Sequence, residues 1–216
     1  VEYGTTWAAQ LRARKPEVPI IGISALNCKD IPQFRMGNFL AFYQRSQLLI
    51  ADPAVIAEIG SLCVGYRSIW TRWKSQKDVA GLDLLMRLLK VPAIIKDQLR
   101  IAIPPQLRGK WDSESPHLAA RWIWHQLQGT PGFLFDELEA ATHLGITRSA
   151  FITFSSNDAF SAARYQGALA CDERPRWWIS EMRAAVESII GVNIVGTVAE
   201  YREELLVALD VAKGKR

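Results

Sequence analysis

Aromatic rings and cationic side chains alternate in the segment from Tyr66 to Lys74, and such a surface could bind nucleic acid. Aromatic rings stack on bases, while lysine and arginine attract phosphates. The same spacing also fits a helix whose tryptophans pack inward while the stems of its cations lie across them. Both interpretations are kept for the three cations of this segment, which are Arg67, Arg72 and Lys74.

A second stretch of interest runs from Phe135 to Ser155, with the sequence FDELEAATHLGITRSAFITFS. Its first half, as far as Leu144, is rich in good helix formers, with Leu138, Ala141 and Leu144 on one expected face. Gly145 then supplies a residue that accepts the positive φ of a tight helix exit. After a short polar run, apolar residues return at helical spacing at Ala150, Phe151 and Phe154.

This spacing resembles the helix-turn-helix unit of DNA-binding regulators. In such units a small residue stands four places before a turn glycine, as Ala141 stands before Gly145, and apolar residues flank the turn. The resemblance implies double-stranded DNA as the partner and a homodimer that spans two half-sites. It places Arg148, whose planar fork suits guanine or phosphate, in the major groove. The full set of side chains that it directs to the groove is Thr147, Arg148, Ser149 and Thr153.

The second half of the same stretch also permits a different structure. Residues 150–155 are rich in phenylalanine, isoleucine and threonine, a composition that favours a β-strand. A helix ending at Gly145 and followed by a buried strand would use the same residues without any contact to DNA. The position of 150–155 in a helix or in a sheet therefore decides between the two interpretations.

No common catalytic constellation is visible in the sequence. The three histidines, at 117, 125 and 143, share no ligand spacing, and the three cysteines form no CxxC pair. There is no P-loop, no GxGxxG after an expected strand and no GxSxG. We therefore predict no catalytic residue, no cofactor and no metal site, and an enzyme is not the favoured class.

Composition and charge indicate an ordinary soluble chain with a basic middle. No apolar run approaches the roughly 20 residues of a membrane span, and no secretory segment is visible, so we expect a cytoplasmic protein without membrane contact. Residues 61–130 carry eleven Lys and Arg against five Asp and Glu, whereas 131–216 carry nine against twelve. Because phosphate attraction supplies most non-specific affinity for DNA, we expect the basic middle to assist the helix-turn-helix.

The segment WAAQLRARKPEVPIIGISA, residues 7–25, resembles the third helix and fourth strand of a response-regulator receiver domain. Ser24 and Ala25 stand where that family keeps its switch hydroxyl. No phosphoacceptor Asp precedes the segment, and no Lys-Pro follows a further strand. The resemblance therefore implies a response-regulator-type controller that does not use phosphorylation. The other interpretation is a helix–turn–strand unit of the kind found in every α/β protein.

We expect a mostly helical α/β protein with short strands at 17–25 and 192–196 and, in the alternative above, at 150–155. The Pro-rich linker 104–115 is the expected boundary between an N-terminal region, 1–103, and a C-terminal helical region, 116–216, which contains the helix-turn-helix at 135–155. Thr197 and Glu200 form an expected capping box. The expected helices, from caps and apolar spacing, are 5–15, 36–50, 52–73, 78–90, 91–103, one beginning at 115–116, 157–170 and 178–190.

Two functional hypotheses follow. The leading one is a DNA-binding regulatory protein that acts through the helix-turn-helix and the basic central surface. The competing one is a non-enzymatic interaction subunit of a larger complex, because eight tryptophans provide large aromatic anchors for another protein.

Overall fold

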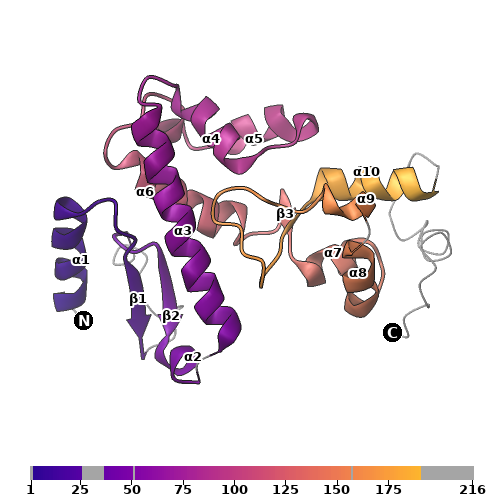
Figure 1. Ribbon diagram of the computed structural model, residues 1–216, viewed down its shortest axis with the longest axis horizontal. Helices are drawn as coiled ribbons and strands as arrows, with labels where there is room; N and C mark the ends of the chain where they lie inside the picture. Colours follow the sequence, from indigo (N-terminus) through magenta and orange to yellow (C-terminus); the bar gives the residue numbers. More distant parts are fainter. Residues whose placement is uncertain (1, 26–36, 51, 157, 191–216) are drawn as a thin grey trace. The chain divides into compact units, whose positions relative to one another are not determined.

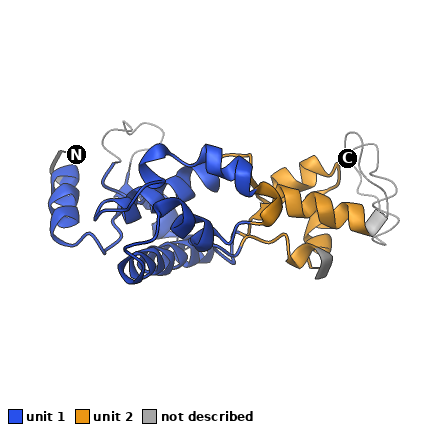
Figure 2. Cartoon of the chain, turned by 90° about the horizontal axis from the view of Figure 1, so that it is seen from above, with its two compact units in different colours: residues 1–91, 96–129, 166–174 blue, residues 92–95, 130–165, 175–216 orange. Residues whose placement is uncertain are grey.

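The computed structural model describes residues 2–25, 37–50, 52–156 and 158–190, and these are mostly helical with a few short strands (Figure 1). The chain divides into two compact units, shown in two colours in Figure 2. Unit 1 comprises residues 1–91, 96–129 and 166–174, and unit 2 comprises residues 92–95, 130–165 and 175–216. The expected linker 104–115 lies inside unit 1, and the chain passes between the units at 129–130, 165–166 and 174–175 as well as around 92–95.

Unit 1 begins with helix α1 (Glu2–Arg14), strand β1 (Ile21–Ser24), strand β2 (Ala41–Gln44) and the short helix α2 (Arg45–Leu49). The two strands are parallel, with Ile21 opposite Ala41. The expected helix over 36–50 is therefore wrong at β2, where Ala41 and Tyr43 alternate with less buried neighbours. A strand of this kind forms because its backbone pairs with β1, a partner that a local helix pattern does not show.

Helix α3 (Pro53–Ser75) is the long helix of unit 1 and begins where the sequence predicts, because the Asp52 carboxylate accepts a hydrogen bond from the Ala54 amide at 2.9 Å. Its inward side chains pack with helix α6 (Ser115–Trp122), which continues into a π-helical turn at Ile123–Leu127 (Figure 1). The buried apolar residues of α3 are Val55, Leu62, Tyr66, Ile69, Trp70 and Trp73.

Helix α4 (Gly81–Leu89) and helix α5 (Lys96–Ala102) are shorter than the expected 78–90 and 91–103. Residues 166–174, which we call the strap, return to unit 1 and lie against α3. A Cβ added at Gly65 would stand 2.7 Å from the Leu169 backbone nitrogen, so only glycine allows this approach. Leu169 itself has a φ of 65°, a left-handed conformation that leucine rarely adopts.

Unit 2 contains two short antiparallel strands, β3 (Leu134–Phe135) and β4 (Trp177–Trp178). Its helices are α7 (Glu137–His143), α8 (Arg148–Ser155), α9 (Asp158–Ser161) and α10 (Ile179–Ile190). The alternative strand at 150–155 is wrong, because this segment is helical. Its inward residues Phe151 and Phe154 are buried, and the Phe151 ring meets the Trp177 ring edge-on with centroids 4.9 Å apart.

The helix expected over 157–170 ends at Ser161. Residues 163–165 instead pair with the β4 region, since the Ala163 carbonyl accepts from the Trp178 amide and the Tyr165 amide donates to the Arg176 carbonyl. Asn157, at the expected start of this helix, the strand expected at 192–196 and the capping box of Thr197 and Glu200 lie outside the described residues.

The exit from α7 has the hydrogen bonds of a Schellman motif around Gly145, whose φ is 67°. The Gly145 amide donates to the Thr142 carbonyl at 3.1 Å, and the Ile146 amide donates to the Ala141 carbonyl at 3.0 Å. The expected apolar face of this helix is wrong at one position, because Leu138 is 63% exposed.

Replacing Gly145 with alanine should destabilise the α7–α8 pair by roughly 1–2 kcal/mol, because an L-residue is strained at positive φ. Hydrogen exchange of peptides covering 137–155 in the full chain measures this effect as faster exchange. Gly132→Ala is the control, since a Cβ at Gly132 meets nothing within 4 Å. Equal protection in the two variants would contradict the argument.

His117 lies buried in unit 1, with Nε2 at 3.0 Å from the Gly37 carbonyl oxygen. Burial, together with the nearby Arg12 and Arg121 cations, lowers the pKa of His117 from 6.5 to about 4. The unfolded chain therefore binds more protons than the folded chain between these two values. The free energy of unfolding should therefore have its full value above pH 6.5. It should decrease by on the order of 2 kcal/mol as the pH falls toward 4.

Denaturant titrations of the full chain at several pH values test this by giving the slope of the free energy of unfolding against pH. The variant His117→Gln should make this slope smaller. Burial also lowers the pKa of His125 and His143, so a residual slope of the same sign should persist. A slope that is identical with and without His117 would contradict the assignment.

Candidate functional site

Helix α8 presents a continuous polar edge to solvent. Arg148, Ser149, Ile152 and Thr153 are exposed, whereas Ala150, Phe151 and Phe154 face the core of unit 2. Thr147 is half-buried because it caps the helix, its hydroxyl accepting from the Ala150 amide at 3.2 Å. The four sequence-predicted residues therefore occupy the first two turns of one short helix, where Arg148 and Thr153 lie about 140° apart around the axis.

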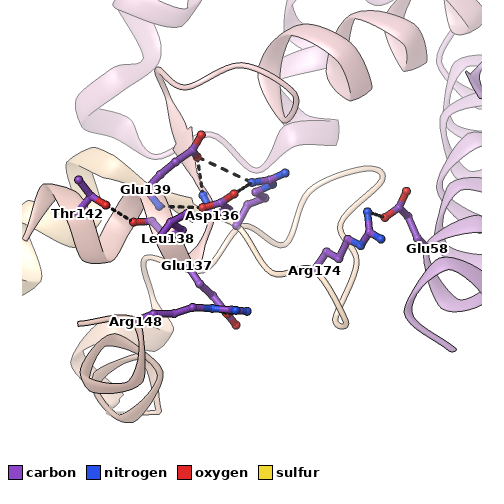
Figure 3. Close-up of polar contacts among 9 residues, drawn as sticks. Glu58, Asp136, Glu137, Leu138, Glu139, Thr142, Arg148 and Arg174 are labelled. Atoms are coloured by element: carbon purple, nitrogen blue, oxygen red, sulfur yellow. Dashed lines mark hydrogen bonds and ion pairs between the residues drawn. The ribbon is translucent and has the colours of Figure 1, made fainter. Parts of the chain in front are cut away.

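The guanidinium of Arg148 pairs with the Glu137 carboxylate at the start of α7 (Figure 3). Arg148 Nε and Nη2 both donate to Glu137 Oε2, at 2.9 and 2.6 Å. The Arg148 side chain is nevertheless 65% exposed, while that of Glu137 is 24% exposed. The cation is accessible from solvent, but a carboxylate already neutralises it.

The neighbouring hydroxyls make only local hydrogen bonds. The Thr147 and Ser149 hydroxyl oxygens are 3.1 Å apart, and the Thr153 hydroxyl donates to the Ser149 carbonyl at 3.2 Å. Side-chain to backbone bonds of this kind are easily exchanged for an external partner where they are exposed to water. The edge of α8 can therefore offer hydroxyl donors and acceptors as well as a guanidinium.

Further acidic groups lie at the N-terminus of α7. Asp136 and Glu139 form a capping box (Figure 3). Both carboxylates also lie close to the Arg176 guanidinium, at 3.2 and 3.9 Å. Over its whole sequence, unit 2 has 8 Lys and Arg against 10 Asp and Glu, whereas unit 1 has 18 against 12. The positive charge that attracts phosphates is therefore concentrated in unit 1.

On α3 the three predicted cations Arg67, Arg72 and Lys74 are exposed but do not share one face. At about 100° per residue, Arg67 and Lys74 lie about 20° apart around the helix, whereas Arg72 lies about 140° from Arg67. Trp70 and Trp73 are buried, so neither ring is a stacking platform. The Lys74 ammonium lies 5.6 Å from the centroid of the Trp70 ring. This agrees with the interpretation in which the tryptophans pack inward and the cations lie across them.

Arg72 instead lines an open pocket of about 570 Å³ between α3, the end of α4 and the strap. Arg87 and Lys90, from the end of α4, line the same pocket. Sequence reasoning missed this site. One signal was available, a run of small residues at helical spacing on α3, which leaves room for the strap: Ala57, Gly60, Ser61, Gly65 and Ser68.

The strap is held by a buried carboxylate on α3. Glu58, 2% exposed, accepts a hydrogen bond from the Tyr43 hydroxyl at 2.6 Å and forms an ion pair with Arg174 (Figure 3). Burial, followed by the hydrogen bond and charge of Glu58, raises the pKa of Tyr43 far above its ordinary value, so its hydroxyl stays protonated. The Leu169 carbonyl also accepts from Gln128 Nε2, and the Ala168 amide donates to the Leu88 carbonyl.

Within the described ranges, no three His, Cys, Asp or Glu side chains come together as ligands for a metal ion. None of the helices in this part of the chain combines the length and apolar character that crossing a bilayer requires.

The chain matches no protein-family model, and comparisons with the curated proteins and with the solved structures find no significant similarity.

Replacing Arg174 with alanine should destabilise unit 1 by roughly 1–3 kcal/mol, because a buried carboxylate loses its counter-charge. The double variant Glu58→Gln/Arg174→Ala should recover part of the loss, since it removes the charge as well. Arg100→Ala is the matched control, because its Asp97 partner has a 97% exposed side chain. Denaturant unfolding of the full chain measures the changes, and similar losses for Arg174→Ala and Arg100→Ala would contradict the assigned role.

Proposed function

We propose that this chain is a DNA-binding regulatory protein and that the exposed edge of α8 contacts the major groove of double-stranded DNA. The observation that carries the proposal is the accessible Arg148 on the same two helical turns as three hydroxyl side chains, at the start of a helix that follows the Gly145 turn from α7. In the helix-turn-helix arrangement, the N-terminal residues of the second helix contact base edges.

The dimensions of α8 support this role. An α-helix with its side chains is about 10–12 Å across, which fits the major groove of B-DNA, about 12 Å wide, and the eight residues of α8 extend about 12 Å along it. Its apolar residues all anchor it except Ile152, which is 45% exposed beside the polar residues. An exposed isoleucine can contact the methyl group of thymine, as apolar side chains do in the groove.

Binding requires Arg148 to exchange Glu137 for a base or a phosphate. The pair lies at the surface, with the Arg148 side chain 65% exposed and that of Glu137 24% exposed, so the exchange should cost about 1 kcal/mol, the upper part of the range for surface ion pairs. Without DNA the pair holds the guanidinium in an extended position, while Glu137 repels phosphates that approach without a compensating contact. The pair therefore favours specific over non-specific binding.

The long-range attraction comes from unit 1 in this proposal. Arg67 and Lys74, which share one side of α3, are the cations of the basic central surface, together with Arg72 on another side. Because unit 2 has fewer Lys and Arg than Asp and Glu, we expect the salt dependence to correspond to few phosphate contacts made by unit 2.

The further parts of the proposal follow from the helix-turn-helix arrangement and from the start of the chain. One α8 covers one stretch of groove, so we propose a homodimer for two half-sites and a cytoplasmic site of action. Residues 7–25 fold as α1 followed by β1, with Ser24 as the last residue of that strand, and this order is compatible with a receiver-like start.

The competing hypothesis of a Trp-rich interaction subunit has less support, because five of the eight tryptophans are buried: Trp70, Trp73, Trp111, Trp177 and Trp178.

Selection of bound duplexes from a randomised pool, followed by fluorescence-anisotropy titrations over a range of salt, tests the proposal. Arg148→Ala should weaken binding to a selected site by about 1–3 kcal/mol. Glu137→Gln should strengthen binding, since it removes the competing charge and keeps the shape. Arg183→Ala is the matched control, an exposed arginine on α10 of the same unit, and should change binding only slightly.

Failure to enrich any duplex, or an equal loss in Arg148→Ala and Arg183→Ala, would contradict α8 as the reading element. A loss in Arg67→Ala/Lys74→Ala that is uniform across sequences would assign those residues to phosphate contact.

A further inference from the structure

The pocket of unit 1 is cationic, and no ion pair among the described residues neutralises it. Its rim carries Arg72 from α3 and Arg87 and Lys90 from the end of α4, and no aspartate or glutamate lines it. None of these three cations forms an ion pair within the described part of the chain. Three unneutralised cations around one hollow repel one another, and an anion bound between them would relieve the repulsion.

The pocket has a volume suited to a small organic molecule. Its volume of about 570 Å³ falls within the range of roughly 300–1,000 Å³ that is typical of ligand sites. Beside the cations lie apolar groups of Val64, Leu88 and Leu169, and polar groups of Ser61, Ser68 and Gln166. The lining therefore combines an apolar surface with hydrogen-bonding groups and a cationic rim.

The parts of the pocket wall that do not belong to α3 contain strained backbone conformations. Leu169 and Lys90 are the two non-glycine residues with positive φ among the described residues, and both line this pocket. Each such conformation is unfavourable for an L-residue and persists only where the surroundings impose it. The Glu58–Arg174 pair, the Gln128 hydrogen bond and the close approach at Gly65 impose it on the strap.

From these observations we propose that the pocket of unit 1 binds a small organic phosphate of the size of a nucleotide. Arg72, Arg87 and Lys90 hold the phosphate groups, and the apolar lining holds the organic part. Guanidinium groups suit this ligand because they donate two parallel hydrogen bonds to phosphate oxygens. The inference does not depend on DNA binding by α8, since no residue of unit 2 takes part in it.

Isothermal titration of the full chain with ADP, with pyrophosphate and with adenosine tests the proposal. ADP should bind most tightly, pyrophosphate more weakly and adenosine weakest, and the affinity of the two anions should fall as salt is raised. Arg72→Gln and Arg87→Gln should each reduce ADP affinity about tenfold, because each removes a charged hydrogen-bond donor.

Arg100→Gln is the matched control, since it removes the same charge from α5 of the same unit, does not line the pocket, and should leave ADP affinity within about twofold. Lys90→Asn adds a variant whose residue tolerates the left-handed backbone, and it should also weaken binding. The absence of binding by both ADP and pyrophosphate would overturn the proposal. An equal loss in Arg100→Gln and Arg72→Gln would overturn it too, because it would indicate attraction to the general surface.

A second pair of variants tests the shape of the pocket without changing its charge. Gly65→Ala should displace the strap and weaken ADP binding several-fold, because its Cβ would overlap the Leu169 backbone. Gly60→Ala also lies in the pocket lining, but its Cβ meets nothing within 4 Å, so it should bind nearly as the parent does. Unchanged affinity in a folded Gly65→Ala chain would exclude the strap as a wall of the binding site.

Discussion

Unit 1 depends on the burial of one carboxylate. Glu58 lies on α3 with almost no exposure, and a buried charge is tolerated only when it is paired and hydrogen-bonded. Its two partners come from distant parts of the chain, Tyr43 in β2 and Arg174 in the strap. This one group therefore links the small sheet, the long helix and the returning segment. The strap forms one wall of the pocket beside α3, and its ion pair with Glu58 holds that wall in place.

Three arginine–carboxylate pairs differ in ways that match different roles. Arg174 reaches a buried carboxylate, so its loss would leave an uncompensated charge in the core. Arg176 is mostly covered and joins two carboxylates that also cap α7, which makes it part of the framework of unit 2. Arg148 is the most exposed of the three, and its pair with Glu137 is the one that an external ligand can replace at low cost.

The two proposed binding surfaces, the edge of α8 in unit 2 and the pocket of unit 1, differ in their charge. Unit 2 has a slight excess of acidic residues and offers a compact helix pair with one accessible guanidinium. Unit 1 has the positive excess and offers a hollow with three cations. A reading helix needs specific contacts more than bulk charge, whereas a phosphate site needs concentrated cations. The two surfaces are therefore chemically suited to different anions.

Local signals in the sequence determined much of the secondary structure. Asp52 and Pro53 specify the start of α3, and Gly145 specifies the exit from α7, because caps and left-handed turns depend on a few adjacent residues. The exposure of Arg148, Ser149 and Thr153 could also be predicted, since helical spacing decides which side of a short helix faces the core. Only the tertiary structure decided the rest. The strand at Ala41–Gln44 required pairing with β1, and the helix expected over 157–170 ended early because 163–165 pair with the β4 region. The division of Arg67, Arg72 and Lys74 between two sides of α3, and the meeting of Arg72 with Arg87, Lys90 and the strap, depended on contacts between residues far apart in the chain, and such contacts leave no periodic pattern in a single sequence.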